Sequence, residues 1–362
     1  MSKLVLGLMS GTSADGLTVC AIRPAPFKII GFKNYPYPSA FQQKLLGAFE
    51  LKAPQLSELH YEIGQTYAKL VRRFLKDFHL RPQDLETIGS HGQTIYHGPH
   101  DKIPNTLQIS EPSFLAAQLN VPVVSDFRAK DVVLGGEGAP LIPFFDEYIF
   151  GKKSPKILLN VGGISNFSLV GKNIKTKGFD AGPGNTLMDL CCQQFFNRPF
   201  DKNGALAARG KADTKLVKKL LTQKYFLQKP PKSLDKNAFG AAYLRRYFPT
   251  EKFTSPCDLL ATLNYFTAAA IADQVTRFVP KKFQQELIVS GGGCYNQTLL
   301  KNLQACLPHV KICSTLDYGI DPHAKEAAAF ALFAWLALHR KINHCADATG
   351  ARRNSILGKI SL

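Results

Sequence analysis

A pattern of β-rich segment, glycine-containing turn and second β-rich segment occurs twice in this chain of 362 residues. It spans residues 4–22 and again residues 156–170. A strand that passes through a short turn into another strand predicts a β-hairpin rather than a strand that leads into a helix. Two such hairpins about 150 residues apart indicate two related halves. Chance similarity between glycine-containing hairpins is the alternative.

Strand-like segments alternate with helical patterns along the rest of the chain, which predicts an α/β fold. In residues 56–78 the apolar side chains recur in steps of three and four, as on one face of a long helix. Residues 323–339 are apolar nearly all round and predict a buried helix. Further helices are expected at residues 112–119, 213–222, 259–279 and from 296, and further strands at 87–90, 121–125, 286–290 and 311–313.

Composition indicates an ordinary globular protein, with 45% hydrophobic and 20% charged residues and a length of about two domains. The longest apolar stretch, residues 327–338, has 12 residues, whereas a membrane-spanning helix needs roughly 20. The start of the chain does not have the pattern of a secretory signal. The 8 cysteines contain no Cys-x-x-Cys pair. We therefore expect reduced thiols, no membrane partner and a cytoplasmic location.

The net charge is +18, from 45 Lys and Arg against 27 Asp and Glu, which first suggests a polyanionic partner such as nucleic acid. Residues 198–252 alone hold 14 basic and 4 acidic residues. No motif that reads nucleic acid accompanies them. We therefore expect no nucleic-acid partner, a mostly solvated basic surface, and a smaller part that favours small anionic substrates.

Three glycine-rich turns follow strands, at residues 11–16, 162–163 and 291–293. Successive backbone N–H groups in such turns can form a nest for phosphate oxygens. The first turn is no P-loop, since Leu17 stands where that motif requires Lys, and no Rossmann fingerprint opens a helix here. Nucleotide binding and ordinary hairpin loops both remain open at this point.

Asp180 precedes a Gly-Pro-Gly turn, and Asn185 after that turn is a plausible N-cap for a following helix. A carboxylate held between a strand and a helix N-terminus suits a general base. A solvated turn residue is the alternative.

Residues 90–94 (Ser-His-Gly-Gln-Thr) end an expected strand, and His91, Gln93 and Thr94 could recognise sugar hydroxyls; a structural histidine is the alternative for His91. Arg128 could clamp a substrate carboxylate or form an internal salt bridge. The spacing of His91 from the two following histidines fits no helical zinc motif. The chain has neither a Gly-x-Ser-x-Gly elbow nor a His-Glu-x-x-His motif.

Residues 7–16 (GLMSGTSADG) resemble the opening signature of the anhydro-N-acetylmuramic acid kinases. Similarity to that family continues in order along nearly the whole chain. It covers residues 90–97, 126–128, 135–141, 160–166, 179–189, 230–233, 291–296 and 319–331.

The resemblance implies an α/β fold of two ribonuclease-H-like domains of the actin/Hsp70/hexokinase superfold, with ATP and substrate in a cleft between them. We expect the N-terminal domain to comprise residues 1–125 plus 343–362 and the C-terminal domain residues 126–342. The implied reaction opens the anhydro ring of 1,6-anhydro-N-acetylmuramic acid with water and phosphorylates O6 from ATP, in peptidoglycan recycling. A kinase for another sugar and an actin-like nucleotide-binding switch are the alternatives.

The resemblance also implies the site residues. Asp180 matches the catalytic base, Mg²⁺ is expected on the phosphate oxygens without a direct protein ligand, and the assembly is expected to be a homodimer. ATP-binding residues are expected to be Gly11, Thr12, Ser13, Ala14, Asp15, Gly16, Leu17, Thr18, Gly162, Gly163, Gly291, Gly292 and Gly293, and substrate-binding residues His91, Gln93, Thr94, Arg128, Glu137 and Glu326.

The sequence departs from the family pattern at four places. Thr18 stands where relatives usually have Asp, Glu137 replaces a usual Gln, and Asn264 replaces a common Thr. The usual Thr-Gly-Arg-Glu is Leu-Asp-Lys-Asn at residues 234–237. None of these changes removes Asp180 or the glycine turns.

Overall fold

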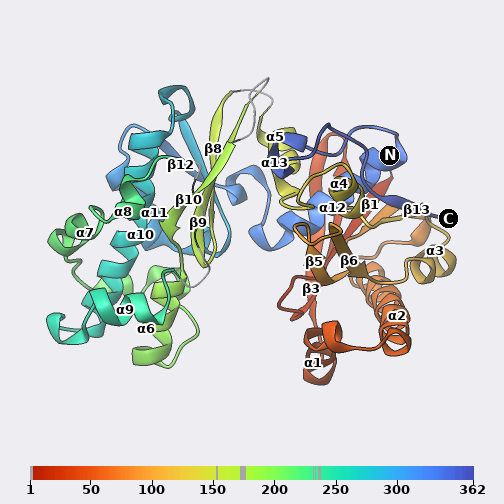
Figure 1. Ribbon diagram of the computed structural model, residues 1–362, viewed down its shortest axis with the longest axis horizontal. Coiled ribbons are helices and arrows are strands. Elements are labelled where there is room, and N and C mark those ends of the chain that lie inside the picture. Colours follow the sequence, from red (N-terminus) through yellow and green to blue (C-terminus); the bar gives the residue numbers. More distant parts are fainter. Residues whose placement is uncertain (1–2, 152–153, 172–176, 231, 233, 235–237) are drawn as a thin grey trace. The chain divides into compact units, whose positions relative to one another are not determined.

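The computed structural model describes residues 3–362 except 152–153, 172–176, 231, 233 and 235–237. The chain divides into two compact units (Figure 1). The first unit comprises Met1–Ile149 and Gly319–Leu362, and the second comprises Phe150–Tyr318.

This division differs at both edges from the one expected at residues 125 and 342. Residues 126–149 and 319–342 belong to the first unit. The main reason is α12 (Pro322–Leu338), which packs against the strands of that unit. The apolar helix expected at 323–339 is therefore present, and its burial decides where the second crossing between the units falls.

A six-stranded sheet forms the centre of the first unit. Its strands are β1 (Leu4–Met9), β2 (Gly16–Pro24), β3 (Phe27–Pro36), β4 (Leu85–Ser90), β7 (Val123–Ser125) and β13 (Lys359–Ser361), in the order β13-β7-β4-β1-β2-β3. β1, β2 and β3 pair antiparallel, whereas β1, β4 and β7 are parallel. β13 pairs antiparallel with β7, so the C-terminal end of the chain extends this sheet.

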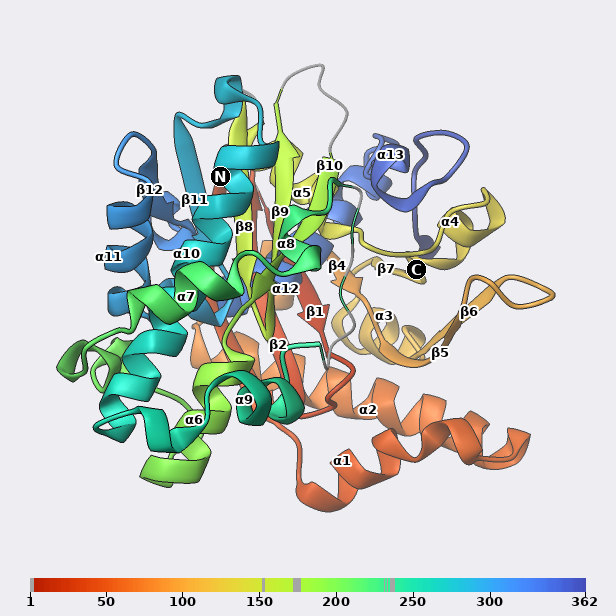
Figure 2. The same ribbon diagram turned by 60° about the vertical axis from the view of Figure 1, so that its left-hand side comes forward.

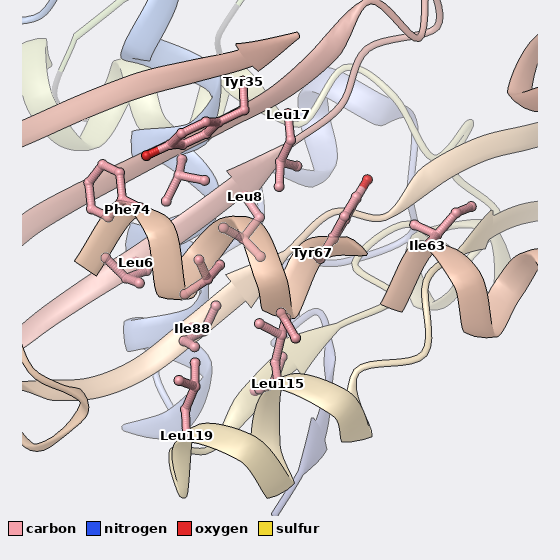
Figure 3. Packing of buried hydrophobic residues seen from close by; sticks show 14 of the residues in the cluster. Leu6, Leu8, Leu17, Tyr35, Ile63, Tyr67, Phe74, Ile88, Leu115 and Leu119 are labelled. Atoms are coloured by element: carbon pink, nitrogen blue, oxygen red, sulfur yellow. The ribbon is translucent and has the colours of Figure 1, made fainter. Parts of the chain in front are cut away.

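Helices cover both faces of the first sheet. α2 (Ala53–Asp77) and α3 (Ser113–Leu119) pack on one face, where Tyr67 and Phe74 of α2 share a core with Leu6 and Leu8 of β1 (Figure 3). Successive residues of a strand point to opposite faces. Gly7 therefore points toward α12, so closely that a Cβ on it would lie 1.8 Å from the carbonyl oxygen of Ala327.

A five-stranded sheet forms the centre of the second unit. Its strands are β8 (Lys156–Val161), β9 (Ile164–Val170), β10 (Lys177–Pro183), β11 (Glu286–Ser290) and β12 (Lys311–Ser314), in the order β10-β9-β8-β11-β12. β8, β9 and β10 pair antiparallel, and β8, β11 and β12 are parallel.

The two sheets share one topology. In each, three antiparallel strands come first along the chain and two parallel strands then join beside the first strand. The correspondence covers five strands rather than one hairpin, so chance similarity of two turns does not explain it. This strand order is the ribonuclease-H-like arrangement that the family resemblance implied for both halves.

Two helices of the second unit, α10 (Pro256–Phe278) and α11 (Gln297–Cys306), share a core with its sheet. Between β10 and β11 the chain also forms a helical region that packs on another side of α10 (Figure 2). It contains α6 (Thr186–Phe196), α7 (Thr214–Leu220), α8 (Lys224–Leu227) and α9 (Ala241–Tyr247).

The remaining elements are short. The first unit has the hairpin β5 (Gln93–Gly98) and β6 (Asn105–Ile109), with α1 (Ser39–Leu46), α4 (Ala129–Val133), α5 (Ile142–Phe150) and α13 (Ala346–Thr349). Short 3₁₀ turns are η1 (Ala48–Glu50), η2 (Pro82–Asp84), η3 (Lys202–Gly204), η4 (Ala207–Arg209), η5 (Thr250–Lys252), η6 (Lys281–Phe283), η7 (Gly292–Tyr295) and η8 (Thr315–Tyr318). Within the described residues, no helix has the length and apolar character needed to span a membrane.

Candidate active site

The turn between β1 and β2 is the first of the three glycine-rich turns. The Ala14 N–H donates to the carbonyl oxygen of Gly11 at 3.1 Å, and Ala14 has a φ of 48°, in the left-handed region. The Ser13 hydroxyl donates to the Asp15 carboxylate at 3.2 Å. These bonds give the turn a fixed shape before any ligand is present.

The side chain of Gln93 makes hydrogen bonds to this turn and to the residue before it. Its side-chain NH₂ donates to the Gly11 carbonyl at 3.1 Å, and its amide oxygen accepts from the Ser10 hydroxyl at 2.7 Å. The Tyr37 hydroxyl donates to Ser10 at 3.2 Å. Gln93 and Gly11 lie 82 positions apart, and local sequence patterns cannot reveal a contact over that separation. In the structure the buried amide of Gln93 bonds to this turn, and the expected contact of Gln93 with a sugar hydroxyl stays a prediction.

His91 is an internal residue with 3% of its surface exposed. Its Nε2 accepts from Arg128 Nε at 2.9 Å, and its Nδ1 lies 2.9 Å from the Gly92 carbonyl. The ring packs at 4.7 Å from that of Phe330. Burial, and then the charge of Arg128, lower the pKa of His91 to about 3. His91 is therefore neutral and orients Arg128. Thr94, the third residue of this group, is half-buried on β5 opposite Gln108.

Arg128 is held by neutral acceptors. Besides His91, its Nη1 donates to the Gly138 carbonyl at 2.7 Å. Burial lowers the pKa of Arg128, and attraction to Glu326 and Asp131 opposes that shift. Within the described residues, Arg128 makes no salt bridge at contact distance, so the internal ion pair that was the alternative to a substrate clamp is not formed there.

Asp131 fixes the loop that carries Gly138 and Glu137. One carboxylate oxygen accepts from the Gly138 N–H at 2.6 Å, and the other lies 2.6 Å from the Thr349 hydroxyl and 2.5 Å from His344 Nε2. Burial alone would raise the pKa of Asp131, but these hydrogen bonds outweigh it and lower the pKa. The C-terminal segment thus holds the loop. Glu137 itself is exposed, with its N–H donating to the Thr349 carbonyl at 2.8 Å.

The second glycine-rich turn, at Gly162 and Gly163, bonds to the turn after β10. Their carbonyl oxygens accept from the N–H groups of Asn185 at 2.8 Å and Gly184 at 3.1 Å. A Cβ on Gly184 would lie 2.3 Å from the Gly162 oxygen, so only glycine permits this approach. Asn185 stands at the N-cap position of α6, but its side chain donates to Val161 at 3.1 Å instead of capping the helix.

The third turn, residues 291–293, lies against the end of β8. Gly291 has a φ of 74°, and a Cβ on it would lie 2.7 Å from the Val161 carbonyl oxygen. A Cβ on Gly293 would lie 2.4 Å from the Val161 side chain. The second turn, the third turn and the turn that follows β10 therefore meet at one end of the second sheet.

Asp180 lies in β10, immediately before an irregularity in the pairing with β9. Such a bulge redirects the neighbouring side chains. Its carboxylate accepts from the Leu234 N–H at 2.7 Å, its own N–H donates to the Lys232 carbonyl at 3.1 Å, and its carbonyl accepts from the Tyr225 hydroxyl at 2.6 Å. Burial raises the pKa of Asp180, and the Leu234 bond partly opposes this. A half-buried, oriented carboxylate of raised pKa can accept a proton.

Sequence reasoning missed several residues of these surroundings. Asp189 on α6 is half-buried, and burial raises the pKa of its carboxyl to about 6. Lys232 is buried beside Asp180. His344 and Thr349 both contact Asp131. Thr349 lies 218 residues from Asp131 along the chain. Only Asp189 had a local signal, an acid in the first turn of an expected helix.

The four departures have different surroundings. Thr18 lies in β2 opposite Asn34 of β3. Asn264 is buried in α10, donating to Asn296 at 3.2 Å and accepting from Asn302 at 2.9 Å, so an amide suits that position. Residues 235–237 lie outside the described residues, as do 231 and 233 of the preceding motif.

Two units of one ribonuclease-H-like topology, each with a glycine-containing turn in its first hairpin, define a duplicated α/β protein of the actin, Hsp70 and hexokinase class. The family model described as anhydro-N-acetylmuramic acid kinase matches residues 3–362. Two proteins named anhydro-N-acetylmuramic acid kinase are similar over the full length. The one from Aliivibrio fischeri is 36% identical, covering 98% of both chains, and the one from Pasteurella multocida is 37% identical, covering 98% of this chain and 96% of its own. The chain belongs to the anhydro-N-acetylmuramic acid kinase family, and it is a phosphotransferase.

Solved structures show more distant similarity. The activator of 2-hydroxyisocaproyl-CoA dehydratase from Clostridium difficile, with bound ADPNP, has a TM-score of 0.45 and 10% identity, covering 92% of this chain and 94% of its own. A ROK family glucokinase from Streptomyces griseus, in complex with glucose and AMPPNP, has a TM-score of 0.41 and 13% identity, covering 92% of this chain and 99% of its own.

Proposed function

We propose that this protein converts 1,6-anhydro-N-acetylmuramic acid, water and ATP into N-acetylmuramic acid 6-phosphate and ADP, a reaction of peptidoglycan recycling in the cytoplasm. Family membership over residues 3–362 supports the substrate class. The observation that carries the chemistry is Asp180, whose carboxylate is half-buried, oriented by the Leu234 N–H and raised in pKa.

Asp180 acts as the general base toward water. The O6 of the substrate is locked in an ether bond to C1, so it carries no proton that a base could remove. Asp180 instead takes a proton from a water molecule as the water oxygen bonds to C1 and the C1–O6 bond breaks. O6 then accepts the γ-phosphoryl group, and ADP leaves. A carboxylate whose pKa is raised by burial is a stronger base than one in water.

The glycine turns support phosphate binding. Gly162 and Gly163 leave no side chain between their backbone and a ligand, and a Cβ on Gly163 would lie 2.8 Å from the Thr186 hydroxyl. Residues 11–18 would supply backbone N–H groups and the Thr12 hydroxyl, and residues 291–293 would lie near the adenosine. Phosphoryl transfer depends mainly on positioning and charge neutralisation, which rigid turns provide.

Mg²⁺ fits this arrangement as an ion carried by the nucleotide. No group of three or more His, Cys, Asp or Glu side chains within the described residues could hold a metal ion. Mg²⁺ readily keeps water ligands and binds substrate phosphates. When bound, it neutralises phosphate charge, and the turns at Gly11 and Gly162 would hold the phosphates that carry it.

Arg128 would bind the lactyl carboxylate of the sugar. His91 and Gly138 fix the guanidinium by two hydrogen bonds from Nε and Nη1, while Nη2 bonds to no residue that the structure describes. Thr94, Glu137 and Glu326 are the further candidates for sugar contacts, and Gln93 contributes through the first turn. Assembly as a homodimer remains part of the proposal.

An assay with three sugars tests this function. The purified protein is given ATP with anhydro-N-acetylmuramic acid, N-acetylmuramic acid or glucose, in ¹⁸O-labelled water, and products are followed by mass spectrometry over short times. We expect phosphorylation of the anhydro sugar alone, with one solvent oxygen in the sugar and none in the phosphate. Phosphorylation of another sugar only would identify a different sugar kinase. ATP hydrolysis without a sugar phosphate would support the nucleotide switch.

A further inference from the structure

Lys232 is a buried lysine that the mechanism above does not use. It is 7% exposed, and its Nζ donates to the Tyr225 carbonyl at 3.0 Å and to the Gln274 side-chain oxygen at 2.5 Å. The ammonium also lies 4.6 Å and 5.0 Å from the ring centres of Tyr225 and Phe278. It forms no ion pair with any residue of the described part of the chain, and burying an unpaired cation is unfavourable.

The surroundings of Lys232 form a closed ring with Asp180. The Asp180 N–H donates to the Lys232 carbonyl at 3.1 Å, the Tyr225 hydroxyl donates to the Asp180 carbonyl at 2.6 Å, and Lys232 Nζ returns to the Tyr225 carbonyl. Two residues beyond Lys232, the Leu234 N–H donates to the Asp180 carboxylate at 2.7 Å. The described hydrogen bonds of Asp180 to residues outside its sheet are therefore made by Lys232, Leu234 and Tyr225.

The ammonium links Lys232 to two further parts of the unit, Tyr225 and Gln274. Gln274 is fully buried near the C-terminal end of α10, so the bond from its side-chain oxygen ties Lys232 to a long core helix. Burial lowers the pKa of Lys232 to about 8, with Asp273 opposing the shift. Burial and then the charge of Asp180 raise the pKa of Tyr225, so its hydroxyl stays protonated and donates.

We propose that Lys232 is a positioning residue for Asp180, which fixes the Leu234 N–H and thereby the direction of the catalytic carboxylate. This inference rests on the proposed role of Asp180. Without the ammonium, the Tyr225 carbonyl and the Gln274 oxygen lose their donor, and Lys232 and Leu234 are held less firmly against Asp180. A displacement of about 1 Å in catalytic geometry can lower a rate about 10²-fold. The loss belongs to kcat, since Lys232 touches neither substrate in this account.

The test is a double-mutant cycle in the full-length protein. Lys232→Met keeps the aliphatic stem and removes the ammonium, and it is measured alone and together with Asp180→Asn. The control is Lys229→Met, an exposed lysine three positions away. kcat and both KM values are measured with ATP and anhydro-N-acetylmuramic acid, and thermal unfolding checks that each variant is folded.

We expect Lys232→Met to lower kcat roughly 30- to 100-fold with both KM values within about threefold, and Lys229→Met to change neither. In the Asp180→Asn background the same substitution should lower kcat less than about threefold, because there is no carboxylate left to orient. An equal loss in both backgrounds, or none in either, overturns the proposal. Failure of the wild-type protein to act on this sugar would instead overturn the proposed function.

Gln274→Met provides a second variant if Lys232→Met does not fold. It removes the buried acceptor of the ammonium while leaving Lys232 in place. The same cycle applies, with the same criterion: a loss in kcat that disappears in the Asp180→Asn background supports positioning, and a loss that persists there overturns it.

Discussion

At the scale of single residues, the same chemical groups serve different roles according to partners that lie far away in sequence. His91 and Gln93 occupy a strand end that suggests a sugar-binding loop. In the structure both are buried, and they orient Arg128 and the Gly11 turn. Sequence identified the polar cluster because strand ends carry function. It could not say which groups were already bonded, because Ser10, Gly11 and Arg128 come from other segments.

Asp180 and Asp189 are both half-buried carboxylates, but local sequence drew attention only to Asp180. Asp180 was recognisable from the Gly-Pro-Gly turn that follows it. Asp189 looked like an ordinary acid in the first turn of a helix, where acids are common. Burial, which sequence does not give, raises the pKa of its carboxyl to about 6.

Asp189→Asn should make stability less dependent on pH. The folded-state pKa of Asp189 lies above its ordinary value of 3.8, so the folded protein binds more protons between about pH 4 and 6. The free energy of unfolding therefore falls as pH rises through this window and stays lower above it. Relative to wild type, Asp189→Asn should gain about 1–3 kcal/mol between pH 4.5 and 7.5. Urea titrations at both pH values measure this gain, with Glu58→Gln as an exposed control, and an unchanged difference would contradict the burial of Asp189.

At the scale of secondary structure, strongly periodic segments were predictable and weakly patterned ones were not. The helices expected at 56–78 and 259–279 are α2 and α10, displaced by a few residues at their ends. The hairpin β5–β6 and the C-terminal strand β13 were not expected. β13 has no buried residue among its three, so no alternation of apolar and polar residues marks it. Its conformation follows from pairing with β7, a tertiary contact.

Gly89→Ala should destabilise the packing of α12 on the first sheet. A Cβ on Gly89 would lie 2.1 Å from the Phe330 carbonyl oxygen and 3.0 Å from the Ala334 Cβ. Overpacking of this kind lowers the free energy of unfolding by about 1–3 kcal/mol or more. Gly47→Ala is the control, since its Cβ would have only the Gln43 carbonyl at 3.6 Å nearby, and about 0.5 kcal/mol is expected there. Equal free energies of unfolding for the two variants, measured by chemical denaturation, would show that α12 does not approach β4 so closely.

Asp131→Asn should impair sugar binding through the loop that Arg128 and Gly138 share. The amide replaces one acceptor with a donor, which opposes the N–H and O–H groups around it. We expect the KM for the sugar to rise about 10-fold, which corresponds to about 1.4 kcal/mol, while the KM for ATP stays within about twofold. Asp101→Asn, an exposed carboxylate of the β5–β6 hairpin, is the control. A rise in the KM for ATP alone would place this loop with the nucleotide instead.

At the scale of the whole molecule, the sequence of two hairpins predicted the duplication, but the sequence did not predict the domain edges. The expected edges lay at residues 125 and 342, but packing of α12 against β1, β2 and β4 sets them elsewhere. The sequence also predicted a mostly solvated basic surface at residues 198–252. Of the 14 basic residues in 198–252, twelve are exposed, Lys232 is buried, and residue 236 lies outside the described residues. The basic region is thus mostly solvated surface. Its one buried member among the described residues is Lys232, which we propose positions Asp180.

A net charge of +18 should therefore not confer specific nucleic-acid binding. Fluorescence anisotropy with a labelled DNA duplex at 50 and 200 mM salt provides the measurement. We expect dissociation constants no tighter than the non-specific range of about 10⁻⁴–10⁻⁶ M at physiological salt. Nanomolar binding that survives physiological salt would mean that the basic region is an interface for a polyanion.

The most direct measurement of the central claim is the turnover of Asp180→Asn. The substitution keeps the size of the side chain and removes its ability to accept a proton from water. We predict a decrease in kcat of roughly 10²-fold or more on anhydro-N-acetylmuramic acid, with both KM values within about threefold and the melting temperature of wild type retained. A folded variant that keeps more than about a third of wild-type turnover would contradict the assignment of Asp180 as the base.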